Sequence, residues 1–589
     1  MSTIPASIRG ILRGSEASTT HYLRRLAAGP MPLITVAIVV GAGAGLAAVA
    51  FRWLVQTATR IFTGTTDYSA ATGHPANTWV PWLGGAFVIL APAVGGLIYG
   101  PLVHRFAREA RGHGVPEVMY AVARRGGHIP GRVAVVKALA SAITIGSGGS
   151  VGREGPIVQI GSALGSTLGR MTRMSETQLR TLVACGAAGG IAATFNAPIA
   201  GVFFALELIL RDFATRSFAA VMLSSITASV VGRAILGDHP FLALPAFSVT
   251  QPSEYLLFAG LGLLAGAVGV LFSRILYLIE DACDWAWRGP EWLRPAVGGL
   301  LLGLLLFAMP QLYGVGYPVL EASVAGKYTV GFLLLLVVAK MVATSLTIGI
   351  GGSGGVFAPS LVIGAAFGAA AGEAIGLVVP GLEGQAGTFA LVGMAAVFAG
   401  ATRAPITAGI IFFELTGEYT IILPLLLAVV IATGVSRLLG RDTIYTRKLS
   451  RRGVDLSTPA LPTLRGVSVA AAMSTPPASI PFDRSVHTAL AELGSSHRRA
   501  APVVGSDGKL IGVLTAADAA AALATDDAVG SRTVTELAEP VATVATDDHV
   551  ADVLGHVIEA VATDGMPVVS DGVLVGWLAP ADLLRAAAT

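Results

Sequence analysis

Long apolar segments separated by short polar ones occupy the chain up to about residue 450. Several of them approach or exceed the roughly 18 residues that cross a bilayer as a helix, for example 32–51, 255–272 and 421–436. They predict a polytopic membrane domain built from helices. In the remaining residues, short apolar stretches alternate with polar turns, a pattern typical of a small α/β domain.

Composition agrees with this division. Of the 589 residues, 53% are hydrophobic and 13% are charged, whereas an ordinary soluble domain carries about 25% charged residues. The 73 glycines favour close helix packing and broken helices. With only Cys185 and Cys283, no disulfide framework or multi-cysteine metal site is expected. The N-terminus lacks a short apolar core followed by a cleavage site, so no signal peptide is expected.

Charge divides the chain at the same place. From Gly453 onward, 7 Lys and Arg face 16 Asp and Glu, a net charge of −9, which leaves +12 on the preceding part. Basic residues flank the apolar part on both sides, so the positive-inside tendency places both termini in the cytoplasm. The basic part favours an anionic cargo, and the acidic tail indicates a soluble cytoplasmic domain. We expect a cytoplasmic amphipathic segment at 1–30, a membrane domain at 31–450 and a linker at 451–466.

The membrane part contains two copies of one unit. The segment 137–156 aligns with 340–359 at a constant offset of 203, and ten of the twenty positions are identical. A later match pairs Glu207 with Glu414 at an offset of 207. Repeated halves whose helices are interrupted by Gly and Pro at matching positions indicate a transport site near the middle of the bilayer.

The repeated loops are rich in glycine and lead into helices that begin with proline. Such a start leaves backbone N–H groups free to point at a ligand. With the helix dipole, these donors bind an anion without a fixed positive side chain, and weak binding of this kind suits conduction. The run 157–169 is too short to span, so its helix is expected to begin inside the membrane.

Four segments resemble the selectivity-filter motifs of the CLC chloride channels and transporters, and they occur in that family's order. They are Gly112-His113-Gly114-Val115-Pro116, Gly152-Arg153-Glu154-Gly155-Pro156, Gly355-Val356-Phe357-Ala358-Pro359 and Tyr445. The resemblance covers about 30–450. It implies an all-α membrane domain with inverted internal repeats, assembled in membrane lipid as a homodimer with one anion pathway per subunit.

The resemblance assigns roles by position. Glu154 would be the gating glutamate, whose carboxylate competes with an anion for the outer site, and an intramembrane carboxylate is itself an indicator of function. The backbone around Val356 and Phe357 would hold the central anion together with the Tyr445 hydroxyl. An ion pair with Arg153 is the competing interpretation for Glu154, and an interfacial anchor is the alternative for Tyr445. The other residues expected to bind the anion are His113, Gly114, Val115, Pro116, Gly152, Arg153, Gly155, Gly355 and Ala358.

One position departs from the coupled transporters of this family. Where they commonly have a second glutamate that faces the cytoplasm and passes protons, this chain has Leu208. Leucine cannot carry a proton. The departure therefore favours a passive, voltage- or pH-gated chloride channel, and the alternative is a chloride/proton antiporter that uses the same pathway. We interpret Glu207 and Glu414 as structural carboxylates that cap helices or form hydrogen bonds within the bundle.

A second departure is His113, where the family usually has serine. Histidine is larger and titrates near neutral pH, so it would make conduction depend on internal pH or replace part of the missing proton acceptor. The alternative is a loop histidine turned away from the pathway. Lys137 and Lys340 occupy equivalent repeat positions, which favours a structural role at helix ends over attraction of anions. The Gly155-Pro156 ending does not suggest the fluoride-exporting branch, so chloride is the expected anion.

The tail contains a second repeat at an offset near 64. Each copy predicts the order helix, strand, Asp-Gly turn, strand, helix and resembles one member of a CBS-domain pair, here 467–525 and 526–589. In such pairs a Gly-x-x-Thr-x-x-Asp segment commonly holds an adenine nucleotide. The first copy keeps Thr515 and Asp518, whereas the second retains only Asp582. We expect at most one nucleotide site, the alternative being a dimerising module without ligand.

Other classes of function fit less well. The segment 148–152 matches the G-x-S-x-G pattern of serine hydrolases, but the pattern recurs at 351–355, and no histidine lies inside an apolar helix of the membrane part to act as a base. A divalent-cation transporter needs clustered carboxylates. Nothing indicates a metal site, a required cofactor or a nucleic-acid partner. The prediction is an integral protein of the plasma (inner) membrane, not an enzyme, that carries chloride with or without protons.

Overall fold

The computed structural model describes residues 30–70, 73, 75–237, 252, 254–379, 384–417, 419–454, 467–496, 498–560 and 563–588. The chain forms two compact units, 1–456 and 457–589. The N-terminal segment expected at 1–30 lies outside the described residues except for Pro30, and so does the linker expected at 451–466 except for residues 451–454.

The regular elements of the first unit, among its described residues, are all helices joined by turns and loops. Its first half contains α2 (Pro30–Thr63), α3 (Phe87–Phe106), α4 (Val115–Arg124), α5 (Gly131–Gly146), α6 (Glu154–Met171), α7 (Glu176–Phe195), α8 (Pro198–Phe204) and α9 (Thr215–Leu236). Its second half contains α10 (Glu254–Ala286), α11 (Arg294–Ala308), α12 (Tyr317–Val324), α13 (Val330–Gly349), α14 (Phe357–Gly376), α15 (Ala386–Thr402), α16 (Pro405–Thr416) and α17 (Ile422–Leu439), followed by α18 (Thr446–Ser450). Short 3-10 turns lie at η1 (Pro81–Ala86), η2 (Arg108–Ala110) and η4 (Pro310–Leu312), and a π-helical turn, η3 (Ala205–Leu210), extends α8.

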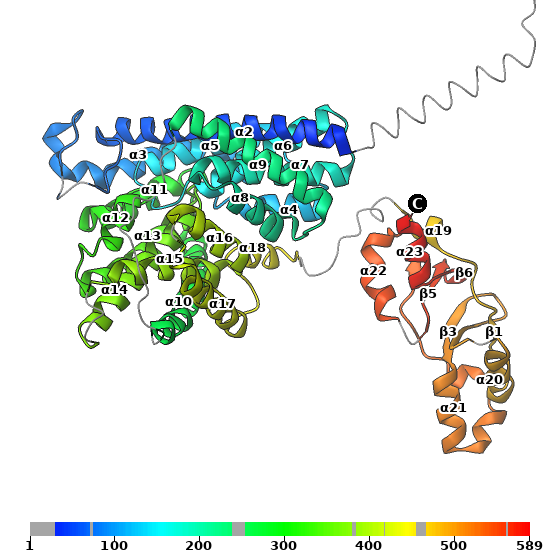
Figure 1. Ribbon diagram of the computed structural model, residues 1–589. Helices are drawn as coiled ribbons and strands as arrows, with labels where there is room; N and C mark the ends of the chain where they lie inside the picture. Colours follow the sequence, from blue (N-terminus) through cyan, green and yellow to red (C-terminus); the bar gives the residue numbers. More distant parts are fainter. Residues whose placement is uncertain are drawn as a thin grey trace, which may run out of the picture. The chain divides into compact units, whose positions relative to one another are not determined.

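The two halves share one packing scheme. In the first half, α2 packs against α7 and α9, and α6 packs against α7. In the second half, α10 packs against α15 and α17, and α14 packs against α15. Figure 1 shows α2–α9, in blue to green-cyan, gathered on one side of this unit and α10–α17, in green to yellow, on the other. The internal repeat predicted from the sequence is therefore a repeat of structure.

Seven helices of the described residues are long and apolar enough to cross a membrane: α2, α3 with η1, α9, α10, α13, α14 and α17. The apolar runs at 32–51, 255–272 and 421–436 coincide with α2, α10 and α17, as expected. Helix α6 extends the expected run 157–169 at both ends and has 18 residues. It begins at Glu154, whose side chain is 1% exposed, so its first turn lies inside the protein.

Equivalent residues of the two halves bond to one another reciprocally. The Gly152 N–H donates to Gly355 O at 2.7 Å, and the Gly355 N–H donates to Gly152 O at 2.6 Å. Likewise Thr347 Oγ1 accepts from the Ser150 N–H at 3.1 Å, and Thr144 Oγ1 accepts from the Ser353 N–H at 3.3 Å. Gly152 and Gly355, Ser150 and Ser353, and Thr144 and Thr347 are each 203 residues apart, so every bond has its counterpart in the other repeat. These bonds define a pseudo-two-fold axis between the repeats, as inverted repeats require.

The second unit contains two copies of one small α/β motif. The first copy has α19 (Val469–Ala472), β1 (Ile480–Pro481), α20 (Val486–Ser495), β2 (Ala500–Val504), β3 (Leu510–Thr515) and α21 (Ala516–Thr525), then η6 (Asp527–Ser531) and η7 (Val534–Glu536). The second has β4 (Val544–Ala545), α22 (Val550–Glu559), β5 (Met566–Ser570), β6 (Val573–Leu578) and α23 (Pro580–Ala588). The predicted helix–strand–turn–strand–helix order is present in both copies.

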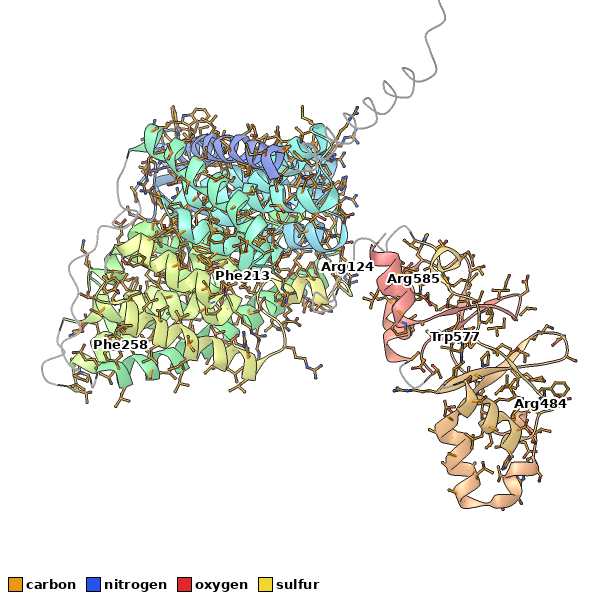
Figure 2. The ribbon with its side chains drawn as sticks, turned by 45° about the vertical axis from the view of Figure 1, so that its right-hand side comes forward. Arg124, Phe213, Phe258, Arg484, Trp577 and Arg585 are labelled. Atoms are coloured by element: carbon orange, nitrogen blue, oxygen red, sulfur yellow. The ribbon has the colours of Figure 1, made fainter. Side chains whose placement is uncertain are left out.

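Each copy has a three-stranded sheet, in the order β1-β2-β3 or β4-β5-β6, with one parallel and one antiparallel pairing. The Asp-Gly turns of the two copies bond to each other, because the Leu510 N–H donates to Gly572 O at 3.0 Å and the Leu574 N–H to Gly508 O at 3.3 Å. Figure 2 shows the side chains of this unit, with Trp577 projecting from β6 and Arg585 from α23.

Candidate functional site

Three helices begin at neighbouring glycine-rich loops in the interior of the first unit. They are α4, α6 and α14, and their loops come from parts of the chain up to about 240 residues apart. Besides the Gly152–Gly355 pair, the Gly112 N–H donates to Gly352 O at 3.1 Å and the Gly354 N–H to Gly112 O at 3.3 Å. The three loops predicted to bind an anion are therefore joined by main-chain hydrogen bonds.

Glu154 lies at the first residue of α6, with its carboxylate directed at the start of α14. Oε2 accepts a hydrogen bond from the Ala358 N–H at 3.4 Å, and Oε1 accepts one from the Tyr317 hydroxyl. A Cβ atom on Gly152 would lie 2.2 Å from Glu154 Oε2, so only glycine at this position leaves room for the carboxylate. The carboxylate thus lies at the start of α14, where a main-chain N–H group without an intrahelical partner points toward it.

The competing interpretation of Glu154, an ion pair with Arg153, stays a prediction, and both side chains contact Tyr317. The Arg153 guanidinium lies over the ring of Tyr317, 5.1 Å from its centroid, which is a cation–π arrangement. The Glu154 carboxylate bonds to the hydroxyl of the same tyrosine. One aromatic side chain therefore contacts both neighbouring charges.

The rings of His113 and Tyr445 lie near each other. Their ring centroids are 6.2 Å apart, and both side chains are 1% exposed. Neither ring nitrogen of His113 has a hydrogen-bond partner within the described residues. Val356 and Phe357 are each 2% exposed, and the Phe357 ring packs against Phe195 and Phe398. The imidazole is therefore buried without a hydrogen-bond partner among the described residues.

The two equivalent lysines donate hydrogen bonds to oxygen atoms of the glycine-rich loops and so stabilise them. Lys137 Nζ donates to Ala110 O at 2.9 Å and to Gly112 O at 2.6 Å. Lys340 Nζ donates to Ser150 Oγ at 2.8 Å and to Gly314 O at 3.2 Å. Both side chains are fully buried. These contacts support the structural role that their symmetry suggested, and the bond to Ser150 gives this serine a structural partner.

The carboxylates Glu207 and Glu414 cap each other's helices across the repeats. Glu207 accepts hydrogen bonds from the Ile406 and Thr407 N–H groups at the start of α16. Glu414 accepts from the Ile199 and Ala200 N–H groups at the start of α8. The structural interpretation of both residues is thereby supported. Leu208, the next residue, is 6% exposed in the π-helical turn and brings no acid to this place.

Tyr317 is the residue of this site that the sequence argument missed. It belongs to Gly314-Val315-Gly316-Tyr317-Pro318, which corresponds to the loop 112–116 at an offset of 202. Only Gly and Pro are shared between these loops, so the match is weaker than that of 137–156. Extending the repeat comparison to it would have predicted a helix start there, and α12 does begin at Tyr317.

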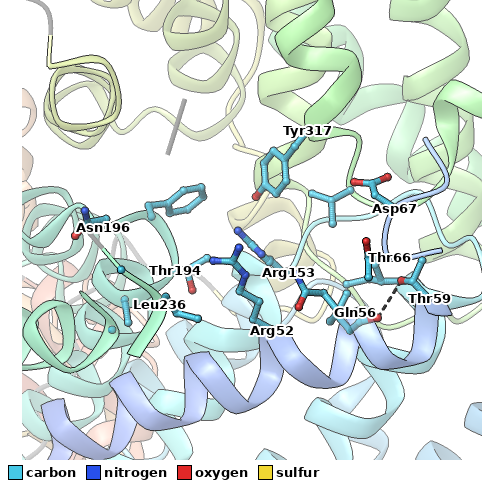
Figure 3. A pocket seen from close by; sticks show the side chains of 18 of the residues that line it. Arg52, Gln56, Thr59, Thr66, Asp67, Arg153, Thr194, Asn196, Leu236 and Tyr317 are labelled. Atoms are coloured by element: carbon cyan, nitrogen blue, oxygen red, sulfur yellow. Dashed lines mark hydrogen bonds between the residues drawn. The ribbon is translucent and has the colours of Figure 1, made fainter. Parts of the chain in front are cut away.

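A cavity of about 360 Å³ reaches Tyr317 and Arg153. Arg52 and Gln56 of α2 also line it, and Figure 3 shows Arg52 and Tyr317 converging on Arg153. A second cavity, of about 290 Å³, is lined by charged residues near the His113 loop, among them Glu117 and Lys448. The described residues contain no group of three or more His, Cys, Asp or Glu side chains that could hold a metal ion.

The two copies in the tail differ at their candidate nucleotide positions. Thr515 is the N-cap of α21, where its Oγ1 accepts from the Asp518 N–H at 3.1 Å. In the second copy, Asp582 is 3% exposed and accepts from the Ala579 N–H at 3.0 Å and the Ser474 hydroxyl at 3.1 Å. In the first copy the Thr515 hydroxyl also donates to the Asp518 carboxylate, so both carboxylates have internal partners. The copies differ in exposure, because Asp518 is exposed and Asp582 is buried.

Comparison with known proteins matches these features to two families. The voltage gated chloride channel family matches residues 95–437, and the CBS domain family matches 468–525 and 534–589. The chain is 35% identical over 428 residues to the H⁺/Cl⁻ exchange transporter ClcA of Vibrio parahaemolyticus, across 72% of this chain and 90% of that protein. It is 33% identical over 427 residues to a ClcB-like chloride channel protein of Ralstonia nicotianae, across 72% and 98% of the two chains. The crystal structure of a slow cyanobacterial Cl⁻/H⁺ antiporter matches with a TM-score of 0.64 at 26% identity, across 72% of this chain and 99% of that one.

Proposed function

The chain belongs to the voltage-gated chloride channel family, and we propose that it exchanges chloride for protons across the membrane. The observation that carries the proposal is the Glu154 carboxylate, buried at the start of α14 where an anion would otherwise bind. The relatives named as exchange transporters and antiporters favour exchange over the passive channel that Leu208 suggested.

The geometry supports exchange because chloride and the Glu154 carboxylate would compete for one binding position. We call this position, beside the Ala358 N–H at the start of α14, the anion seat. Two anions cannot occupy it together without strong repulsion. Chloride therefore enters the seat when the carboxylate leaves or is neutralised by a proton. Because the same carboxylate gives up its place and carries the proton, movement of the two ions is linked.

We propose that His113 contacts the anion at the other end together with Tyr445, Val356 and Phe357. An imidazole N–H is a hydrogen-bond donor, and a donor buried without a partner is costly unless a ligand satisfies it. The test is His113→Ser in liposomes, with anion selectivity and internal-pH dependence as readouts. Unchanged selectivity and pH dependence would remove His113 from the pathway.

The proposed function is tested by the reversal potential of the purified protein in liposomes. A chloride gradient is applied first and a pH gradient is then added. Exchange predicts that the pH gradient shifts the reversal potential and that Glu154→Ala abolishes proton movement while chloride still passes. A potential that follows chloride alone would contradict exchange and establish the passive channel that Leu208 suggested.

We propose that the chain forms a homodimer in the plasma (inner) membrane with both termini in the cytoplasm. The repeat-equivalent Ile199 and Ile406, the second residues of α8 and α16, are each 42% exposed and form part of an apolar face available to lipid or a second subunit. Cross-linking of cysteines introduced at these positions in native membranes tests the contact. Protease access to tags at the two ends tests the orientation.

We also propose that the first copy of the tail binds an adenine nucleotide. The start of α21 offers main-chain N–H groups to a phosphate, and Thr515 and Asp518 stand beside them. ATP and AMP binding to the full chain should be weakened by Thr515→Ala and left unchanged by Ser570→Ala in the second copy. Equal binding by all three proteins would favour a dimerising module without ligand.

A further inference from the structure

Tyr317 holds a position that makes it more than a packing residue. Its hydroxyl donates to Glu154 Oε1, and its ring carries the Arg153 guanidinium at 5.1 Å. The carboxylate also accepts a hydrogen bond from the Ala358 N–H, which is 3.4 Å long. Hydrogen bonds weaken toward that length, so the phenol is a stronger donor to this carboxylate than the Ala358 N–H.

The fold does not require a tyrosine here. In the first repeat, the loop 112–116 reaches the equivalent helix start with Val115 in the place of Tyr317. Val115 is 2% exposed and packs in the hydrophobic core. An apolar side chain thus suffices to begin the helix, and the hydroxyl is an addition found in the copy that faces Glu154.

We propose that Tyr317 is a latch that holds the Glu154 carboxylate in the anion seat and so sets how readily chloride displaces it. The proposal rests on the gating role proposed for Glu154. A hydrogen bond to an ionised carboxylate is stronger than one between neutral groups. The latch therefore stabilises the ionised, seated carboxylate more than the protonated one. Tyr317 acts through Glu154 and is a positioning residue.

Arg153 lies against the same tyrosine. Its guanidinium is 5.1 Å from the centroid of the Tyr317 ring, which is a cation–π arrangement. The same side chain thus retains the cation by its ring and the carboxylate by its hydroxyl. Arg153 and Tyr317 line the 360 Å³ cavity, so chloride that enters this cavity reaches the tyrosine that holds the Glu154 carboxylate.

The test is Tyr317→Phe in the purified full chain, with chloride affinity measured by calorimetry. Losing one charge-assisted hydrogen bond changes the balance between the seated and the released carboxylate by roughly tenfold. Chloride should therefore bind about tenfold more tightly to the variant. In a Glu154→Ala background the same change should have no effect, because no carboxylate remains to be held.

Tyr313→Phe is the matched control, since this buried tyrosine donates its hydroxyl to Gly146 O at 2.7 Å. It should leave the chloride affinity unchanged. Installing 3-fluorotyrosine at position 317 keeps the shape but makes the phenol a stronger donor, so chloride should bind about two- to threefold more weakly. This variant decides the question if Tyr317→Phe does not fold.

The outcomes separate the latch from the gate. If Glu154→Ala alters chloride affinity but neither change at position 317 does, Glu154 is a gate without a latch. An effect of Tyr317→Phe that persists in the Glu154→Ala background, or that Tyr313→Phe reproduces, would also overturn the latch. If Glu154→Ala itself leaves chloride affinity and flux unchanged, the proposed function fails first.

Discussion

Replacing Glu207 by glutamine tests whether the carboxylate beside Leu208 caps a helix or passes protons. Its Oε2 accepts from the Thr407 N–H at 2.8 Å and the Thr407 hydroxyl at 2.7 Å, and Oε1 accepts from the Ile406 N–H at 3.2 Å. Glutamine keeps one acceptor and turns an NH₂ group toward a donor. One charge-assisted bond worth about 1.5 to 3 kcal/mol is lost, together with about 0.5 to 1 kcal/mol from the charge at the helix start.

The expected loss is therefore about 2 to 4 kcal/mol for Glu207→Gln. Thermal inactivation of chloride flux in liposomes measures it, and a fall of roughly 5 °C or more is expected. The ratio of chloride to protons moved by the surviving protein should equal that of the unchanged protein. Glutamine cannot carry a proton, but the cap lies outside the proposed exchange.

Glu414→Gln is the matched control from the other repeat. It loses an equivalent cap at α8, where two main-chain N–H groups and no hydroxyl are involved. It should lower thermal stability by a similar or slightly smaller amount. A Glu207→Gln protein of normal stability that moves fewer protons per chloride would refute this reasoning and make Glu207 the substitute for the acid missing at Leu208.

Three further outcomes follow from contacts described above. Lys137→Met and Lys340→Met each leave buried loop oxygens without a donor and should cost roughly 2 to 4 kcal/mol, seen as earlier thermal inactivation of flux; normal stability of both would contradict the stabilising role of the two lysines. Gly152→Ala places a methyl group on the gate carboxylate and should raise chloride flux at alkaline pH several-fold, whereas unchanged flux would mean that the carboxylate is seated elsewhere. Asp582→Ala removes a helix cap and should destabilise the second unit by about 1 to 2 kcal/mol, measured as faster proteolysis of the tail in the full chain.

Much of the fold follows from local patterns that the sequence displays directly. Apolar runs of membrane length predict α2, α10 and α17, because a lipid-facing helix has no other way to satisfy its backbone. The Asp-Gly turns predict the hairpins of the tail, since glycine adopts the positive φ that Gly508 and Gly572 show. The strands β1 and β4 have two residues each and leave no such pattern.

The site was harder to predict from the sequence than the fold, because its contacts join residues about 200 positions apart. The repeat suggested that Glu207 and Glu414 are structural, but which helix each one caps depends on how the halves pack. The resemblance pointed to Glu154, whereas its donor Tyr317 belongs to a loop that shares only Gly and Pro with its counterpart. A comparison of the two repeats shows the residues that they share, so it cannot find a hydrogen-bond donor such as Tyr317 that is present in one repeat alone.

The pseudo-two-fold axis has a consequence for the direction of the pathway. Glu154 and Phe357 occupy equivalent positions in the two repeats, as do His113 and Val315. A main chain that looks alike from both faces of the bilayer gives no means to tell inward from outward. The inward or outward direction of the pathway is therefore set by a few side chains that differ between the repeats. Exchanging residues between equivalent positions is a route to inverting this direction without altering the main chain.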